Sequence, residues 1–252
     1  MSELIIPNQR LVEKTIESIF SLLFPGAHLF SDDEIDLEKQ SIQKNLEYIL
    51  SGLTADSSNI AKSFFDNIDS IKEVLLKDAD YMNESDPAAN NRIEVIALYP
   101  GFYALFCYRI AHYLSKLNIP LFPRMITEYA HRRTGIDIHP AAQLGSPISI
   151  DHGTGIVIGG TTVIGNFVKI FQGVTLGALS LDKSKSSTKR HPTVEDNVIL
   201  YAGCTILGGD TVIGNNSIIG GNVWLTDSID PFSVVYHKSE VIIRNLNGAG
   251  NL

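Results

Sequence analysis

The sequence predicts an α+β protein, with an N-terminal all-α helical domain followed by a C-terminal left-handed parallel β-helix built of hexapeptide repeats. Two observations predict this class. Apolar residues recur at helical spacing in the first half, and a six-residue period replaces that spacing in the second half. We expect the helical domain to span 1–134, the β-helix to span 135–230 with an excursion loop over 178–192, and a tail to span 231–252.

In the first half, apolar residues return every three or four positions. This pattern runs through residues 12–23, resumes over 60–76 with charged residues between the apolar ones, and returns over 102–117. Pro25-Gly26 and Tyr99-Pro100-Gly101 punctuate the pattern, as turn-forming residues do between helices. The sequence therefore predicts a bundle of helices before residue 135.

From Gly135 onward, glycine and β-branched residues dominate, and aliphatic residues stand six positions apart. The ladders are Ile138, Leu144, Ile150 and Ile156, and then Ile158, Ile164, Ile170 and Leu176. Each hexad supplies one short strand and one corner, with the aliphatic side chain directed into the prism and small residues at the turns. The segment 178–192 has no aliphatic ladder, so it must leave the prism as a loop.

The two ladders differ in phase by two residues at a polar, glycine-rich segment, 151–155. Such a break in core patterning is expected where a protein carries function. Asp137 precedes His152 by fifteen residues, three fewer than a coil of three hexads, so an offset of about 10 Å is expected unless the slip closes it. If it does, His152 serves as a general base, because imidazole titrates near pH 6.5, and the Asp137 carboxylate orients it.

Composition narrows the functional classes. The chain has 252 residues with 28 acidic and 20 basic side chains, a net charge of −8, which argues against a nucleic-acid-binding surface spread over the domain. No apolar stretch reaches the roughly 20 residues of a membrane span, and the opening sequence lacks a secretory pattern. Cys107 and Cys204 fit a reduced compartment as small core residues. We expect a cytoplasmic protein that binds neither nucleic acid nor membrane.

Five segments together carry a resemblance to a known family: TGIDIHPAAQLG, DHGTGIVIGGTTVIGN, VTLGA, RHPTVEDNV and AGCTILGG. They closely resemble serine O-acetyltransferase of the hexapeptide-repeat acyltransferase superfamily. Upstream, Asp86-Pro87 precedes YPGFYALFCYRIAHYL at the family's spacing, so the resemblance covers residues 86–226. It implies transfer of acetyl from acetyl-CoA, a co-substrate, to the L-serine hydroxyl as the first step of cysteine synthesis, without a bound cofactor.

The resemblance also implies residue roles. His152 occupies the position of the general base and Asp137 that of the orienting carboxylate. The positions that bind L-serine, or L-cysteine as feedback inhibitor, are Asp86, Asp151, Arg190 and His191. The positions along the pantetheine arm are Ala178, Ala202 and Gly221. Two simpler interpretations stay open: Asp86 as a helix N-cap ahead of Pro87, and Ala202 and Gly221 as turn residues.

The family's active sites lie between neighbouring prisms, so the resemblance implies a homotrimer or a dimer of trimers. The loop lysines, Lys183, Lys185 and Lys189, would reach the phosphates of CoA. Family members often end in isoleucine, which inserts into cysteine synthase, and this chain ends in Leu252, so cysteine synthase is an expected partner with a departure at the contact residue.

Other functions remain open from the sequence. An acetyltransferase of the same superfamily could act on another hydroxyl acceptor. A γ-type carbonic anhydrase shares the prism and binds zinc through three histidines, for which His139, His152 and His191 are the available set. A scaffold without catalysis would not account for Asp151-His152 at the phase slip. We expect no metal.

Overall fold

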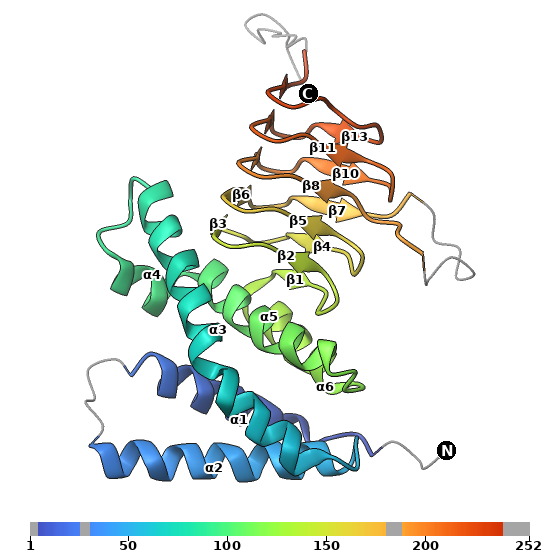
Figure 1. The fold of residues 1–252 in the computed structure, drawn as a ribbon. Coiled ribbons are helices and arrows are strands. Elements are labelled where there is room, and N and C mark those ends of the chain that lie inside the picture. The colour runs from blue at the N-terminus through green and yellow to red at the C-terminus, as the bar shows by residue number, and fades with distance from the viewer. Residues whose placement is uncertain (1–4, 26–30, 180–187, 239–252) are drawn as a thin grey trace, which may run out of the picture.

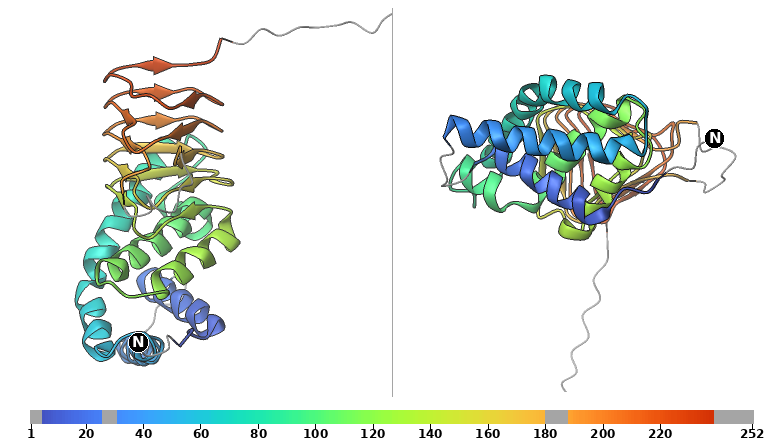
Figure 2. Two further views of the ribbon diagram at one scale, coloured as in Figure 1. Left: turned by 90° about the vertical axis from the view of Figure 1, so that its right-hand side faces the viewer. Right: turned by 90° about the horizontal axis from the view of Figure 1, so that it is seen from below.

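The computed structural model describes residues 5–25, 31–179 and 188–238, which form a helical half and a stack of short parallel strands. Figure 1 shows the strands stacked as a prism above the helices. Figure 2 shows that the helices cover the end of the prism where its first coil lies. The arrangement confirms the predicted fold class, an all-α half followed by a left-handed β-helix.

The described helices are α1 (Gln9–Leu23), α2 (Asp32–Ser51), α3 (Ser57–Ser85), α4 (Arg92–Leu98), α5 (Pro100–Lys116) and α6 (Phe122–Thr134). Local sequence sets several of their ends. At the start of α2, the Ser31 hydroxyl and the Glu34 carboxylate each accept the other residue's backbone N–H, a capping box. Pro100 is the first residue of α5, where its missing N–H costs no hydrogen bond. Gly135 ends α6 in the left-handed conformation, at φ 72°.

The turn between α3 and α4 decides the local role of Asp86. Helix α3 ends at Ser85, and Asp86 follows as its C-cap, with its backbone N–H donating to the Met82 carbonyl. The N-cap of α4 is Asn91, whose side chain accepts the N–H of Glu94. The interpretation of Asp86 as a helix N-cap ahead of Pro87 is therefore wrong.

Strands of successive coils pair in parallel to form the three faces of the prism. Sheet A contains β1 (Asp137–Ile138), β4 (Val157–Ile158), β7 (Thr175–Gly177), β10 (Thr205–Leu207) and β13 (Trp224–Leu225). Sheet B contains β2 (Gln143–Leu144), β5 (Val163–Ile164), β8 (Thr193–Val194) and β11 (Val212–Ile213). Sheet C contains β3 (Ile148–Asp151), β6 (Val168–Phe171), β9 (Ile199–Leu200), β12 (Ile218–Ile219) and β14 (Val234–Val235). Because β14 lies in the segment expected to be the tail, the coil extends past residue 230.

Each strand directs an aliphatic side chain into the prism, as the ladders predict. In sheet A the stacked residues Ile138, Ile158, Leu176 and Ile206 are all buried. The first coil is longer than the second: Asp137 aligns with Val157, 20 residues on, whereas Val157 aligns with Thr175, 18 residues on. The two extra residues lie between β3 and β4, in the segment 151–155 where the ladders change phase.

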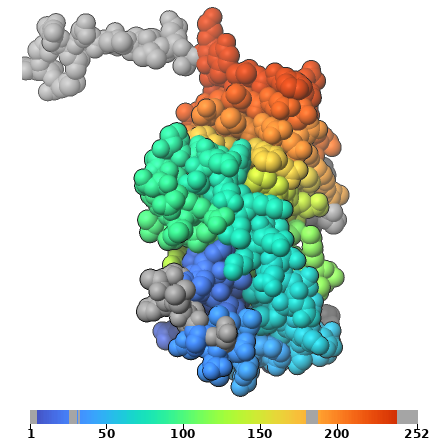
Figure 3. All heavy atoms as spheres, turned by 60° about the vertical axis from the view of Figure 1, so that its left-hand side comes forward, coloured from blue at the N-terminus to red at the C-terminus, as the bar shows by residue number. Residues whose placement is uncertain are grey.

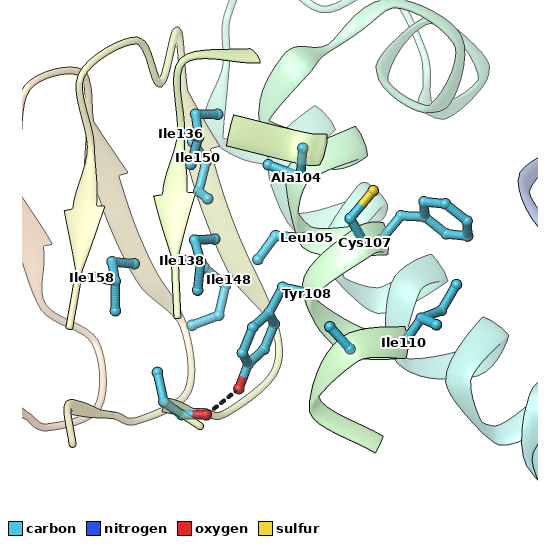
Figure 4. Packing of buried hydrophobic residues seen from close by; sticks show 14 of the residues in the cluster. Ala104, Leu105, Cys107, Tyr108, Ile110, Ile136, Ile138, Ile148, Ile150 and Ile158 are labelled. Carbon is cyan, nitrogen blue, oxygen red and sulfur yellow. Dashed lines mark hydrogen bonds between the residues drawn. The ribbon is translucent and has the colours of Figure 1, made fainter. Parts of the chain in front are cut away.

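Helix α5 packs against the first coil (Figure 4). Leu105 and Tyr108 lie against the isoleucines of β1 and β3, and Cys107 faces the other helices as a buried free thiol. The buried Tyr108 hydroxyl donates to the Ala142 carbonyl at 2.6 Å and accepts the Leu144 N–H at 3.1 Å. A buried hydroxyl with both partners satisfied fixes this contact without an energetic penalty.

A buried ion pair fastens α3 and α5 to the loop before β3. Asp78 on α3 is fully buried, and its Oδ2 lies 3.0 Å from Nη2 of Arg109 on α5. The Asp78 carboxylate also accepts the Ser146 hydroxyl and the N–H of Ile148, the first residue of β3. Arg109 donates to the backbone carbonyls of Leu144, the last residue of β2, and of Gly145, the first residue of that loop. Figure 3 shows the result, with α3 and the segment after it lying directly against the coils of the prism.

Among the described residues, no single helix combines the length and hydropathy of a membrane span. Only α4 and α5 taken together meet that criterion, and the chain bends by 73° between them. Most of α5 is buried between the other helices and the prism, as expected of a core helix.

Candidate active site

The corner between sheets C and A presents His152. The corner follows β3, and His152 adopts the left-handed backbone conformation there, at φ 56°, with Gly153 and Gly155 also at positive φ. A non-glycine residue in this region is uncommon and often marks a functional turn. The imidazole points outward and is 72% exposed, and its Nε2 lies 3.6 Å from Oδ1 of Asp151, the last residue of β3. We call this region the His152 corner.

Asp86 belongs to the His152 corner because α3 ends there. Its carboxylate accepts the Tyr99 hydroxyl at 2.6 Å and the Ala88 N–H at 2.8 Å. These hydrogen bonds lower the pKa of Asp86, and positive charge on Lys169 and His152 lowers it further. The Asp86 carboxylate in turn raises the pKa of Tyr99 to about 12. Asp86 is therefore ionised at neutral pH.

Lys169, on β6, links Asp151 to the end of α3. Its ammonium lies 3.5 Å from Oδ2 of Asp151 and donates to the Ser85 carbonyl at 2.7 Å. The side chain is 14% exposed. The sequence does not predict this contact, because periodicity assigns Lys169 to the outer side of a strand without relating it to α3. The sequence does not predict the contact between Tyr99 and Asp86 either, because that contact depends on how the turn after α3 folds.

A second polar corner lies between sheets A and B, where the strands of sheet A end, and we call it the His191 corner. The His152 corner lies where those strands begin. His191 precedes β8 and is 8% exposed. Its Nδ1 accepts the Thr161 N–H at 3.1 Å, which leaves the ring proton of the neutral imidazole on Nε2. Burial, together with the positive charge of Arg190, lowers the pKa of His191 to about 4, so the ring is neutral at pH 7.

Asp137 and His139 lie two coils before His191, near the same corner. The Asp137 carboxylate is 3.3 Å from Nη1 of Arg124 on α6. His139 accepts the Ala141 N–H on its Nδ1 at 3.1 Å, and burial lowers the pKa of His139. Asp137 and Arg190 both act electrostatically on His139, which places them in one neighbourhood.

The structure does not bring Asp137 to His152 within one chain. Asp137 aligns with Val157, which lies five residues beyond His152 and past the corner. The phase slip lengthens the first coil to 20 residues, so it increases the offset expected from an 18-residue coil instead of closing it. Within the described residues, the carboxylate that contacts His152 is that of Asp151.

The small residues expected along the pantetheine arm divide between the two corners. Ala202 and Gly221 follow β9 and β12 at the His152 corner, in successive coils; a Cβ on Gly221 would lie 3.2 Å from the Ala202 carbonyl oxygen. Ala178 follows β7 at the His191 corner. The predicted site residues thus form two sets, the first with Asp86, Asp151, His152, Ala202 and Gly221, and the second with Asp137, Ala178, Arg190 and His191.

The three histidines considered as zinc ligands are divided in the same way. His139 and His191 lie at one corner and His152 at the other. In the part of the chain that the structure describes, the group with ligand atoms close enough for a metal is Glu128, His131 and Asp137. Arg124 already pairs with both carboxylates of that group, which accounts for their proximity as an ion-pair network.

Of the three loop lysines that were expected to reach the phosphates of CoA, Lys189 is the one that the structure describes. The Lys189 ammonium donates to the backbone carbonyls of His191 at 2.7 Å and Thr161 at 3.0 Å, so it is engaged at the base of the loop. This engagement argues against the expected reach of Lys189 to a phosphate. Lys183, Lys185 and Leu252 lie outside the described residues.

Comparisons with known proteins find serine acetyltransferases. The chain is 36% identical to the plasmid serine acetyltransferase of Synechococcus elongatus, in an alignment that covers 96% of this chain and 84% of that protein. It resembles serine acetyltransferase 1 of Entamoeba histolytica in complex with L-cysteine, with a TM-score of 0.80 and 31% identity over 92% of this chain and 87% of the other.

A serine acetyltransferase in complex with CoA has a TM-score of 0.63 and 27% identity over 89% of this chain and 95% of the other. No family model matches the chain. Similarity at this level along nearly the full length of both sequences, on the same fold, identifies the family. The chain belongs to the serine acetyltransferase family.

Proposed function

We propose that this chain is a serine O-acetyltransferase, which transfers acetyl from acetyl-CoA to the L-serine hydroxyl and gives O-acetyl-L-serine and CoA, the first step of cysteine biosynthesis. One observation carries the proposal. Where the prism departs from its regular coil, it presents His152 beside Asp151 and Asp86, in a chain of this family. The L-cysteine complex of a relative supports it, because cysteine differs from serine only by a thiol in place of the hydroxyl.

His152 is the general base in this mechanism. Its ring nitrogen takes the proton of the serine hydroxyl while the oxygen bonds to the thioester carbonyl carbon of acetyl-CoA. The carbon–sulfur bond then breaks, and the CoA thiolate takes the proton from the imidazolium. No acyl-enzyme forms. An imidazole that is 72% exposed at a corner is accessible to both substrates.

Charge assigns the two corners to opposite ends of serine. The carboxylates of Asp86 and Asp151 suit the ammonium group. The planar fork of Arg190 and the Nε2–H of neutral His191 suit the carboxylate. Among the described residues, the buried Nε of Arg190 has no hydrogen-bond partner, so this donor is not committed to another group of the chain.

We expect a homotrimer, because one chain holds the two corners at opposite edges of sheet A. In a closed three-fold ring of prisms, the His152 corner of one copy meets the His191 corner of the next. Each site then joins His152 of one copy to Asp137 and Arg190 of its neighbour. The outward residues of sheet A between the corners include Val157, Thr175 and Thr205, whose β-branched side chains suit close packing. Pairing of two trimers through the helical half is a further expectation.

The same assembly accommodates the other expected ligands. The pantetheine arm of acetyl-CoA would run between copies, past Ala202 and Gly221 of one and Ala178 of the next. L-Cysteine carries the same ammonium and carboxylate as serine, so it would compete as a feedback inhibitor. Cysteine synthase is the expected partner of the segment that ends in Leu252, and a pull-down after removal of the last five residues tests this. We infer a cytoplasmic location because Cys107 and Cys204 are free thiols, which suit a reducing compartment.

The reaction is tested by thiol release from acetyl-CoA with L-serine as acceptor. His152→Ala should lower kcat by about 10²- to 10⁴-fold, since a general base contributes about that much. His131→Ala, which removes an exposed imidazole on α6, is the matched control. Release that survives in His152→Ala would overturn the mechanism. A wild-type protein that releases no thiol with serine at saturating acetyl-CoA would overturn the function.

Subunit complementation tests the shared site. His152→Ala and Arg190→Ala trimers are each expected to be inactive, but a mixed ring has one interface with both corners intact. Random mixing of equal amounts should therefore restore about one quarter of wild-type activity, because about three quarters of the rings are mixed and each has one intact site of three. No recovery after verified exchange of subunits would show that each site lies within one chain.

A further inference from the structure

We propose that Lys169 is a positioning residue of the acceptor site: its ammonium holds the Asp151 carboxylate and the end of α3 together, and so sets where the amine of the acceptor amino acid binds. The proposal rests on the proposed function, because it concerns how serine is held. It arises from a contact between the prism and the helical half that the motif residues do not include.

Lys169 contacts three groups at the His152 corner. Its Nζ donates to the Ser85 carbonyl at 2.7 Å, lies 3.5 Å from Oδ2 of Asp151, and sits 4.7 Å from the centroid of the Phe171 ring. The other carboxylate oxygen of Asp151 faces His152. Asp151 therefore bridges the lysine and the general base, and Lys169 fixes which way its carboxylate is turned.

The Ser85 contact extends this role to Asp86, the next residue. Along α3, Asp78 is held at the beginning of β3, and the Tyr81 hydroxyl donates to the Phe167 carbonyl at 2.9 Å. The Lys169 bond to Ser85 is the last of these attachments before the helix ends. Since the Asp86 carboxylate lies just beyond it, the lysine determines how far Asp86 stands from Asp151.

The charges explain why a lysine suits this place. Asp86, Asp151, His152, Tyr99 and Glu94 are the titratable groups that act on one another here, and Lys169 adds a positive charge among them. Two carboxylates close together repel unless a positive charge lies nearby. With its side chain 14% exposed, the lysine acts in a poorly solvated position where charge interactions are strong. The lysine then keeps the two carboxylates in place for the ammonium of serine.

Three variants separate the charge from the hydrogen bond. Lys169→Met removes both, Lys169→Gln keeps a donor for the Ser85 carbonyl, and Lys169→Arg keeps both. Lys62→Met, on the exposed side of α3, is the matched control. Steady-state kinetics with serine and acetyl-CoA varied separately, from about pH 6 to 9, would be measured for each variant that unfolds at the wild-type temperature.

Lys169→Met should raise the KM for serine about tenfold or more and leave the KM for acetyl-CoA within about twofold. Loss of the ammonium removes a positive charge that opposes protonation of the nearby imidazole. The acidic limb of the kcat/KM profile should therefore move to higher pH by about 0.5 to 1 unit. Lys169→Gln should show the same shift. Lys169→Arg should restore both values in part.

Two results would overturn the proposal while the wild type remains active: an unchanged serine KM and pH limb in Lys169→Met and Lys169→Gln, or equal rises in both KM values. The first would mean that the ammonium has no role in acceptor binding, and the second that it has only a general structural role. If the wild type itself transfers no acetyl to serine, the proposed function fails first, and the two failures are thereby distinguished.

Discussion

Arg109→Met should destabilise the protein strongly, because it leaves the Asp78 carboxylate buried without its partner. The guanidinium lies 3.0 Å from the carboxylate, and Asp78 is fully buried. Methionine keeps much of the volume but none of the donors. Removing one member of a buried ion pair typically costs about 3–5 kcal/mol. The Leu144 and Gly145 carbonyls lose their donors as well, so the lower end of this range is a minimum.

The free-energy cost of Arg109→Met should depend on pH, and the ionisation of Asp78 determines the direction of that dependence. Burial raises the pKa of Asp78 in the folded protein, and the positive charge of Arg109 opposes that rise. Without Arg109 the folded-state pKa rises further above its ordinary value, so the folded state binds a proton more readily than the unfolded state. The contribution of Asp78 to stability is then fully present at pH values below its ordinary pKa. It is lost as the pH rises through the raised pKa of the folded state. The variant should lose less stability at pH 5 than at pH 7.

Thermal unfolding at pH 5 and pH 7 measures both effects. At pH 7 the unfolding temperature should fall by about 6 to 20 °C, since about 2–4 °C corresponds to 1 kcal/mol in a chain of this size. All samples need the same protomer concentration, because assembly stabilises by mass action. The control is Arg92→Met, which breaks the exposed pair with Asp80 at 3.2 Å and should cost less than about 1 kcal/mol. A loss for Arg109→Met as small as that of the control, or independent of pH, would refute the reasoning.

Two further predictions concern the corners. Tyr99→Phe removes the hydrogen bond that lowers the pKa of Asp86, and the KM for serine should rise about three- to tenfold with a smaller change in kcat; an unchanged KM would contradict a role for this contact. A Cβ at Gly159 would lie 2.0 Å from Cδ2 of His191, so Gly159→Ala must displace that ring. The kcat/KM for serine should then fall about 10- to 100-fold, whereas Gly52→Ala, in the helical half, should leave it unchanged.

The fold was predictable because its signals are local in the sequence. Helical periodicity and the six-residue ladders depend on neighbours within one turn or one coil, and each strand's inward aliphatic residue follows from them. Less local features were not predictable in the same way. The last strand, Val234–Val235, pairs with Ile218–Ile219 at a spacing shorter than three hexads, so no ladder reveals it. The alternative interpretation of Asp86 as an N-cap was wrong because Pro87 resembles a first helical residue, although α4 begins only at Arg92.

The sequence predicts a set of candidate site residues but not the contacts that they make. The phase slip at residues 151–155 and the motifs indicate His152, Asp151 and Arg190, but motif spacing alone cannot say which corner each side chain occupies. The contacts of Tyr99 and Lys169 depend on how α3 and the turn after it dock on the prism. That docking depends on contacts between residues 68 to 86 positions apart, for which hexapeptide periodicity carries no information.

In a regular hexapeptide coil, each position lies in the core, in a turn or in an outward row of a sheet. Few positions are therefore available for a catalytic side chain. The two additional residues after β3 break that pattern and turn His152 outward. The same insertion moves Asp137 away from His152 along the chain, so the local change that exposes the imidazole also separates it from the carboxylate proposed to orient it. A neighbouring copy can supply that carboxylate without altering either coil. In this way the departure from the repeat and the separation of His152 from Asp137 follow from one feature of the sequence, and the proposed three-fold assembly would bring the two residues together again.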